Sequence, residues 1–295
     1  MHVTTSHKRF TLILLPLFIA ALLFSILYGI HIISPTDNES YHTRLLEQME
    51  QASSFSEFTD TLFCYETTSD SITTAYTLKN PSAYNIPALE PDLTSFSYRD
   101  YQKENQSSRN VLAFLSDNLK RFSNFELTES EQITYSLLTN NLNLSKAISQ
   151  YPFYEELLGS SSGVQTNLPV TLGEYPLRNE EDVKTYLNLL KQVPAYFEDI
   201  ISYEEQRNKK GYCTPDFLLS SSKEKMETML EGFYNGDNSF ISTFNERIAK
   251  VEGISNRKQQ HYIKQNEDYV KKYVVSAYEN LYQYLEKSLE NAPEN

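Results

Sequence analysis

The chain has 295 residues, and 26 Lys and Arg against 39 Asp and Glu leave a formal net charge of −13 at pH 7. We expect no nucleic-acid partner, because so acidic a chain is repelled by a phosphate backbone. The 2 cysteines are too few for a scaffold built on disulfides, and the 8 glycines favour helices over hairpins.

Residues 1–9 end in Lys8 and Arg9, and residues 10–33 then contain no Asp, Glu, Lys or Arg. An apolar run of this length spans a bilayer as a helix. It is longer than the apolar region of a cleaved signal peptide and lacks a small-residue cleavage pattern. We therefore predict an uncleaved transmembrane anchor at residues 10–33. The positive-inside rule places residues 1–9 in the cytoplasm and the body outside it, so the bilayer of the cell membrane is a partner.

Residues 34–54 contain a polar juncture and the start of a first helix. Apolar residues three and four positions apart continue that helix to Phe63. Three prolines then interrupt residues 79–107, for which we predict an ordered loop. A second helix follows over residues 111–122. Thr128 and Glu131 have the spacing of a capping box ahead of a third helix, whose apolar positions are Ile133, Leu137, Leu138, Leu142, Leu144 and Ile148.

The helical period is lost between Pro152 and Pro176, where we predict at most a short edge strand near residues 167–175. Asn179 then caps a long helix that Pro194 should kink or split, and Gly211 closes it. Further helices run to a tail at residues 291–295. The fold class is mainly α, with the amphipathic helices of residues 55–290 forming one helical domain after the anchor.

The sequence contains no recognisable metal site. A zinc-peptidase helix needs two His one turn apart with Glu beside the first. The five His are His2, His7, His31, His42 and His261, and none is paired in this way. Cys64 and Cys213 lack the close spacing of thiolate zinc ligands, and they either form one disulfide or stay unpaired. We therefore expect no metal and no cofactor in this chain.

One motif has the pattern of a nucleophilic site. Residues 159–163 fit G-x-S-x-G, with Ser161 as nucleophile and His261 as a conceivable base. A helical-looking segment precedes it, whereas the motif needs a strand, so a serine hydrolase remains an alternative without the required context. Glu204 and Glu205 fall on the polar face of their helix. We assign no catalytic residue.

Several segments together resemble a bacterial family. They are Ser162–Val170, Glu174–Pro176 and Glu181–Val183, with Tyr76–Pro81 and Glu204–Gly211 in agreement. Over roughly residues 55–290 the chain resembles the domain of unknown function 885 family. The chain departs from the family at Ala75, where the family favours His, and at Asn85, where it favours Gly.

The resemblance implies a membrane-anchored or secreted protein related to the zincin-like metallopeptidases, with the zinc-binding helix in a C-terminal half. This chain resembles the N-terminal half and stops before the metal site. Its function would be to hold substrate, with zinc expected only if the missing half exists. Gln165, Glu174 and Tyr175 are candidate substrate contacts, because polar residues in an extended segment pair with a peptide backbone.

The alternative is a stand-alone extracytoplasmic module that binds a peptide or a protein. Both hypotheses expect the chain alone to be inactive as an enzyme. They differ in the partner, which is either a C-terminal catalytic half or a free peptide or protein. A chain that is half of a larger fold should expose apolar helix faces.

Overall fold

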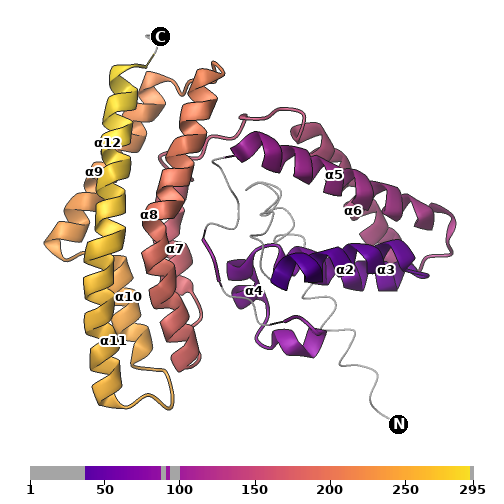
Figure 1. Cartoon of the computed structure of the whole chain (residues 1–295), viewed down its shortest axis with the longest axis horizontal. Helices are drawn as coiled ribbons and strands as arrows, with labels where there is room; N and C mark the ends of the chain where they lie inside the picture. The colour runs from indigo at the N-terminus through magenta and orange to yellow at the C-terminus, as the bar shows by residue number, and fades with distance from the viewer. Residues whose placement is uncertain (1–36, 88–90, 94–99, 293–295) are drawn as a thin grey trace. The chain divides into compact units, whose positions relative to one another are not determined.

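The computed structural model describes residues 37–87, 91–93 and 100–292 of the chain, and it is drawn in Figure 1. These residues are mainly helical, as predicted, and they form no strand. The predicted cytoplasmic segment 1–9 and anchor 10–33 lie outside the described residues. Among the residues that are described, no helix is long and apolar enough to cross a membrane.

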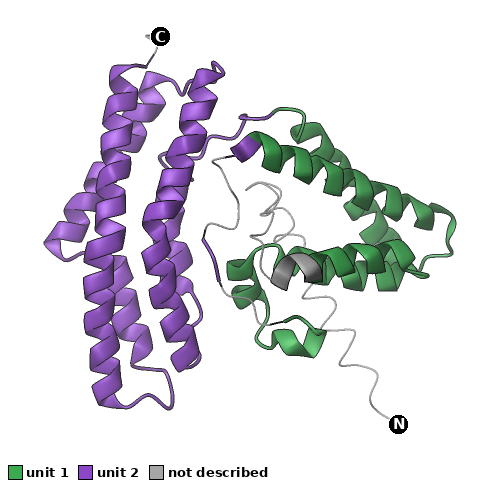
Figure 2. Cartoon of the chain, viewed as in Figure 1, with its two compact units in different colours: residues 1–89, 102–151 green, residues 90–101, 152–295 purple. Residues whose placement is uncertain are grey.

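The chain folds into two compact units, shown in separate colours in Figure 2. Unit 1 comprises residues up to 89 and 102–151, and unit 2 comprises residues 90–101 and 152–295. The single domain expected over residues 55–290 is therefore divided. Residues 91–93 belong to unit 2 because Gln192 holds them: the Leu93 amide donates to Gln192 Oε1 at 2.8 Å, and Gln192 Nε2 donates to the Pro91 carbonyl at 3.3 Å.

Unit 1 is built from helices around an apolar core. Its elements are α2 (Asp37–Gln51), α3 (Phe55–Thr68), α4 (Ser71–Thr77), a 3-10 turn (Pro81–Tyr84), α5 (Tyr101–Lys120, whose first residue belongs to unit 2), a second 3-10 turn (Arg121–Asn124) and α6 (Glu129–Ile148). The rings of Phe55 and Phe58 meet Phe122 at centroid distances of 5.7 and 5.5 Å. These aromatic contacts join α3 to the 3-10 turn that follows α5.

Local capping explains where the helices of unit 1 begin. The predicted first helix is two helices, because the Ser54 hydroxyl caps α3 by accepting from the Glu57 amide at 3.2 Å. The loop predicted over residues 79–107 is shorter than expected, since α5 already begins at Tyr101. The capping box of Thr128 and Glu131 at the start of α6 is confirmed. Asn85 has φ 58°, a left-handed conformation that glycine and asparagine adopt more readily than other residues.

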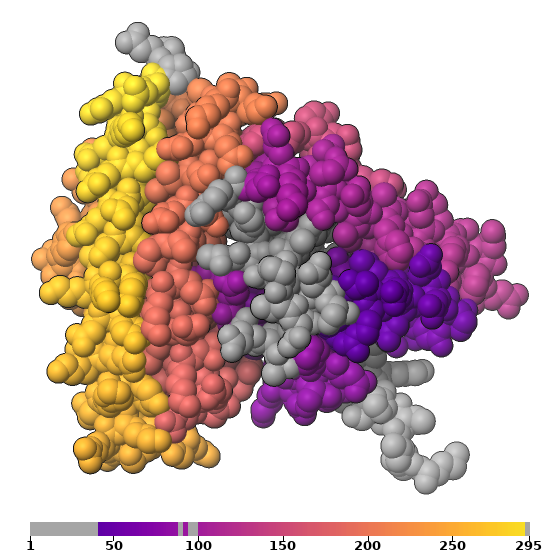
Figure 3. All heavy atoms as spheres, viewed as in Figure 1, coloured from indigo at the N-terminus to yellow at the C-terminus, as the bar shows by residue number. Residues whose placement is uncertain are grey.

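Unit 2 is also helical. It contains α7 (Val164–Glu174), α8 (Glu180–Lys209), α9 (Asp216–Asn235), α10 (Ser239–Ile248), α11 (Asn256–Tyr269), a π-helical segment (Val270–Val275) and α12 (Ser276–Glu290). Helix α12 packs on α9 and α8, and α10 packs on α7 and α11. The space-filling view shows α8 and α12 in contact along the visible face (Figure 3).

The edge strand expected near residues 167–175 is wrong, because this segment is helix α7. Pro169 lies inside α7 and has no N–H to donate to the carbonyl of Gln165, four residues earlier. The hydroxyl of Tyr278 on α12 donates to that carbonyl instead, at 2.6 Å. A contact from a distant helix therefore satisfies the backbone group that the proline leaves free.

Helix α8 begins and ends as the sequence predicts. The Asn179 side chain accepts from the amides of Glu181 and Asp182, and Gly211 adopts φ 85° just after the helix. Pro194 does not split the helix, which is continuous over 30 residues. Its C-terminal end, together with the end of α12, forms the walls of the site described next.

Candidate functional site

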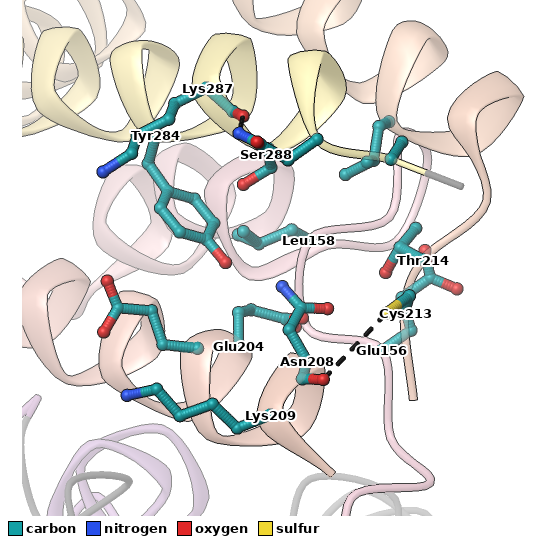
Figure 4. A pocket seen from close by; sticks show the side chains of 14 residues that line it. Glu156, Leu158, Glu204, Asn208, Lys209, Cys213, Thr214, Tyr284, Lys287 and Ser288 are labelled. Atoms are coloured by element: carbon teal, nitrogen blue, oxygen red, sulfur yellow. Dashed lines mark hydrogen bonds between the residues drawn. The ribbon is translucent and has the colours of Figure 1, made fainter. Parts of the chain in front are cut away.

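A pocket of about 480 Å³ opens in unit 2 where the end of α8 faces the end of α12. Figure 4 shows it from close by, with the hydroxyl of Tyr284 pointing into the space between α12 and the α8 residues Glu204, Asn208 and Lys209. The lining residues are mostly polar: Glu156, Leu158, Glu204, Glu205, Asn208, Lys209, Cys213, Thr214, Leu219, Tyr284, Lys287, Ser288, Asn291 and Ala292. Both signs of charge are represented among them.

The turn after α8 shapes one side of this pocket. Gly211, at φ 85°, reverses the chain in a conformation that few other residues adopt without strain. The reversal brings Cys213 and Thr214 back beside the last turn of α8, where the Cys213 thiol lies 4.0 Å from the Asn208 carbonyl (Figure 4). Pro215 then occupies the N-cap position of α9. A local sequence signal thus positions two of the lining residues.

Glu204, which lines the pocket, forms a buried ion pair with Arg207, which does not line it. Glu204 and Arg207 are 3% and 8% exposed, and Arg207 Nη1 lies 3.3 Å from Glu204 Oε2. Arg207 also donates to the Thr214 hydroxyl at 2.6 Å and to the Phe153 carbonyl at 3.1 Å, while Glu204 accepts from the Leu157 amide at 3.2 Å. Buried charges persist only when they are paired in this way. The pair therefore ties residues 153–157 and Thr214 to α8.

Burial changes the acidity of Glu204 and of groups near it. It raises the pKa of Glu155 to about 7, and the neighbouring Glu204 carboxylate raises it further. Burial also raises the pKa of Glu204, against the opposing effect of Arg207. The pKa of Tyr284 is raised to about 12 by burial, so its phenol stays protonated and can donate a hydrogen bond. The site thus combines donors, acceptors and both charges.

This pocket was not predicted from the sequence. Glu204 and Glu205 were expected on the polar face of their helix, which is correct for the exposed Glu205 and wrong for the buried Glu204. The sequence signal for the ion pair was the spacing of Glu204 and Arg207, because residues three positions apart are neighbours on a helix. That spacing alone does not distinguish a surface pair from a buried one.

The predicted substrate contacts lie elsewhere in unit 2. Gln165 is fully buried, and its Nε2 donates to the Gly159 carbonyl at 2.9 Å. Tyr175 is also buried, at the end of α7, whereas Glu174 is exposed. None of the three lines the pocket. The extended segment on which their role was based is a helix, and the role itself remains a prediction.

The structure gives Ser161 no hydrolase setting. It is an exposed residue of a turn that leads into the N-cap of α7 at Gly163, and α7 itself is not preceded by a strand. His261 is an exposed residue of α11. A nucleophile elbow requires a strand before the turn, so the local fold differs from the one that activates such a serine.

Cys64 and Cys213 are both free thiols; Cys64 is partly buried and Cys213 is exposed. Within residues 37–87, 91–93 and 100–292, no three His, Cys, Asp or Glu side chains gather in a way that could hold a metal ion. The donor sets of the described part of the chain therefore do not fit a zinc site.

Comparison with known proteins identifies the family. Residues 85–295 match the family described as bacterial protein of unknown function (DUF885). No curated protein matches the chain. The structure resembles that of "the putative lipoprotein from Colwellia psychrerythraea", with a TM-score of 0.59 and 16% sequence identity, which shows a shared fold.

That resemblance covers 85% of this chain but only 42% of the Colwellia chain, so this chain spans less than half the length of the protein it matches. The family match begins at residue 85 and leaves the resembling segment Tyr76–Pro81 outside it. The family match covers well over half of the chain. The chain therefore belongs to the DUF885 family.

Proposed function

We propose that this protein is a membrane-tethered, extracytoplasmic binding part of a metallopeptidase-like DUF885 protein, and that it holds a peptide in the pocket of unit 2. The observation that carries the proposal is the composition of that pocket: carboxylates, ammonium groups, amides and hydroxyls surround a cavity of about 480 Å³. A ligand held there must offer both charges and several hydrogen-bonding groups.

A short peptide fits this description. Its termini carry opposite charges, and each peptide unit adds one donor and one acceptor. Lys209 on α8 and Lys287 on α12 can approach a terminal carboxylate, while the exposed Glu156 and Glu205 can approach an amine or a basic side chain. The protonated Tyr284 phenol supplies a donor to a peptide carbonyl.

The comparisons support a role inside a larger protein. The Colwellia structure contains this fold in less than half of its length, and its description as a lipoprotein agrees with a location at a membrane. The apolar residues 10–33 would supply the tether here. Because no zinc site fits the described residues, we assign hydrolysis to a separate catalytic part and no chemical step to this chain.

The test uses the full chain purified in detergent micelles. We expect a fluorescent alanine pentapeptide with free termini to bind, and the double variant Lys209→Ala/Lys287→Ala to bind it at least about tenfold more weakly. Lys210→Ala is the matched control, because Lys210 is exposed and does not line the pocket. Equal binding by both variants would refute the proposal that the peptide binds in this pocket. Zinc-dependent cleavage of the peptide by this chain alone would refute the non-catalytic role.

The stand-alone binding module remains the second candidate, since the same pocket would serve it. The two candidates differ in whether a catalytic part is encoded near this chain. Reading the DNA beyond codon 295 in all frames for a His-Glu-x-x-His helix separates them, because only the first candidate requires a catalytic part nearby.

A further inference from the structure

Helix α6 in unit 1 is apolar on two faces. One face enters the core of unit 1 through Leu138 and Leu142, which are 4% and 8% exposed. On the other side lies a second set of large apolar side chains, which we name the α6 stripe: Ile133, Leu137, Leu144, Ile148 and, in the turn after the helix, Tyr151. Four of them are largely exposed, at 52% for Ile133, 51% for Leu144, 41% for Ile148 and 67% for Tyr151.

The spacing of the α6 stripe is that of a packing seam. Ile133, Leu137, Leu144 and Ile148 are four, seven and four residues apart, which places them on one side of the helix. Asn140 occupies the position three residues after Leu137, in line with them, and is exposed. An asparagine within an apolar seam typically fixes the register of two paired helices.

The charge of this segment points to the kind of partner. The chain has a net charge of −13, so two copies repel each other over most of their surface. Residues 132–151, however, contain one charged side chain, Lys146, which is only partly exposed. The uncharged, exposed Ser136 and Ala147 border the stripe instead. Two copies can therefore approach here without bringing acidic groups together.

We propose that a second copy of this chain covers the α6 stripe, with the two α6 helices antiparallel about a two-fold axis near Asn141. A two-fold axis requires a self-complementary patch, and a stripe running along most of the helix meets that requirement. The antiparallel order places the positive end of each helix dipole beside the negative end of the other. One helix pair buries less than the roughly 1,600 Å² of a standard interface, so the dimer is weak.

This proposal rests on a face of unit 1 and is independent of the pocket in unit 2. Its first test is sedimentation equilibrium of the full chain in density-matched detergent micelles. We expect a monomer–dimer equilibrium whose Kd rises at least about tenfold in Leu144→Glu, because the interface would bury a charge. Val170→Glu is the matched control, since Val170 is 58% exposed on α7. Circular dichroism confirms that both variants keep their helices.

Cross-linking tests the orientation in a Cys213→Ser background, which removes the exposed thiol. In the proposed dimer, Ser136 at the edge of the stripe lies near Ala147 of the other copy. A mixture of Ser136→Cys and Ala147→Cys chains should therefore form a disulfide between unlike copies, and neither variant alone should do so. Self-linked Ser136→Cys would overturn the antiparallel order. A chain that stays monomeric, or a dimer that Leu144→Glu leaves intact, would overturn the proposal.

Discussion

At Gly163 the lack of a side chain allows two segments to pack closely. A Cβ atom built there would overlap the Gly159 carbonyl and the amide of Gln165. Gly163 precedes α7, and its own amide donates to the Gly159 carbonyl at 3.0 Å. The backbone is therefore held where only glycine fits, although its φ of −67° is ordinary.

We expect Gly163→Ala to lower the free energy of unfolding by about 1–3 kcal/mol, because a backbone carbonyl cannot move aside for a methyl group. Gly159→Ala is the control, since the nearest atoms to its added Cβ are at 3.8 Å. Urea unfolding followed by circular dichroism compares the two. A Gly163→Ala protein as stable as Gly159→Ala would show that the turn can relax.

His42 makes the stability of the protein sensitive to pH. It is 9% exposed, and burial lowers its pKa to about 4, against the opposing effect of the Thr68 backbone. Its Nε2 lies 2.8 Å from the Thr68 hydroxyl. The Thr68 hydroxyl itself donates to the Cys64 carbonyl at 2.7 Å, so Nε2 of the neutral imidazole is the donor to Thr68. A second proton on the ring has to be accommodated in a largely buried site.

The unfolded chain binds this proton more tightly than the folded one, so the stability contributed by neutral His42 is present above pH 6.5 and is lost as pH falls towards 4. Between pH 7.5 and pH 5 the loss is about 2 kcal/mol. We expect His42→Gln to remove this part of the pH dependence in urea unfolding, and His261→Gln, which alters an exposed imidazole, to keep it. An unchanged profile in His42→Gln would contradict the assignment.

At the scale of elements, α7 and α12 depend on each other through one hydrogen bond. Tyr278 is fully buried, and its hydroxyl donates to the Gln165 carbonyl that Pro169 leaves without an intrahelical partner. Removing the hydroxyl leaves a buried carbonyl unsatisfied, which costs about 1–3 kcal/mol.

A double-mutant cycle tests this coupling. We expect Tyr278→Phe to destabilise the protein by about 1–2 kcal/mol, and by clearly less when Pro169→Ala is also present, because the new backbone amide at that position can then donate to the Gln165 carbonyl. The measurement is the unfolding free energy of all four proteins. Additive changes would show that Tyr278 does not stabilise α7 through this carbonyl.

At the scale of the whole molecule, each unit has its own core. Phe122 of unit 1 is 1% exposed among Phe55, Phe58 and Phe125, and Phe197 of unit 2 is 1% exposed beside Tyr278. Residues that share a core unfold together, and separate cores can open separately. The two units should therefore respond independently to damage in their cores.

We expect Phe122→Ala to increase amide hydrogen exchange in α2, α3, α5 and α6 while α8 and α12 keep their protection. Phe197→Ala should produce the reverse pattern. Each change removes about 3–5 kcal/mol of packing from one core. Hydrogen exchange read by mass spectrometry resolves the helices. Faster exchange throughout the chain in both variants would show a single cooperative unit.

Local patterns along the chain suffice to predict the helical class, the capping box at Thr128, the cap at Asn179, the turn at Gly211 and the apolar positions of α6. These features depend on residues a few positions apart, so propensity and spacing suffice to predict them. Long-range packing, by contrast, makes residues 164–174 a helix and buries Glu204. Those outcomes depend on Tyr278, 113 residues after Gln165, and on how Arg207 meets the backbone carbonyl of Phe153 and the hydroxyl of Thr214. No local pattern encodes such contacts, because they form only when distant segments pack together.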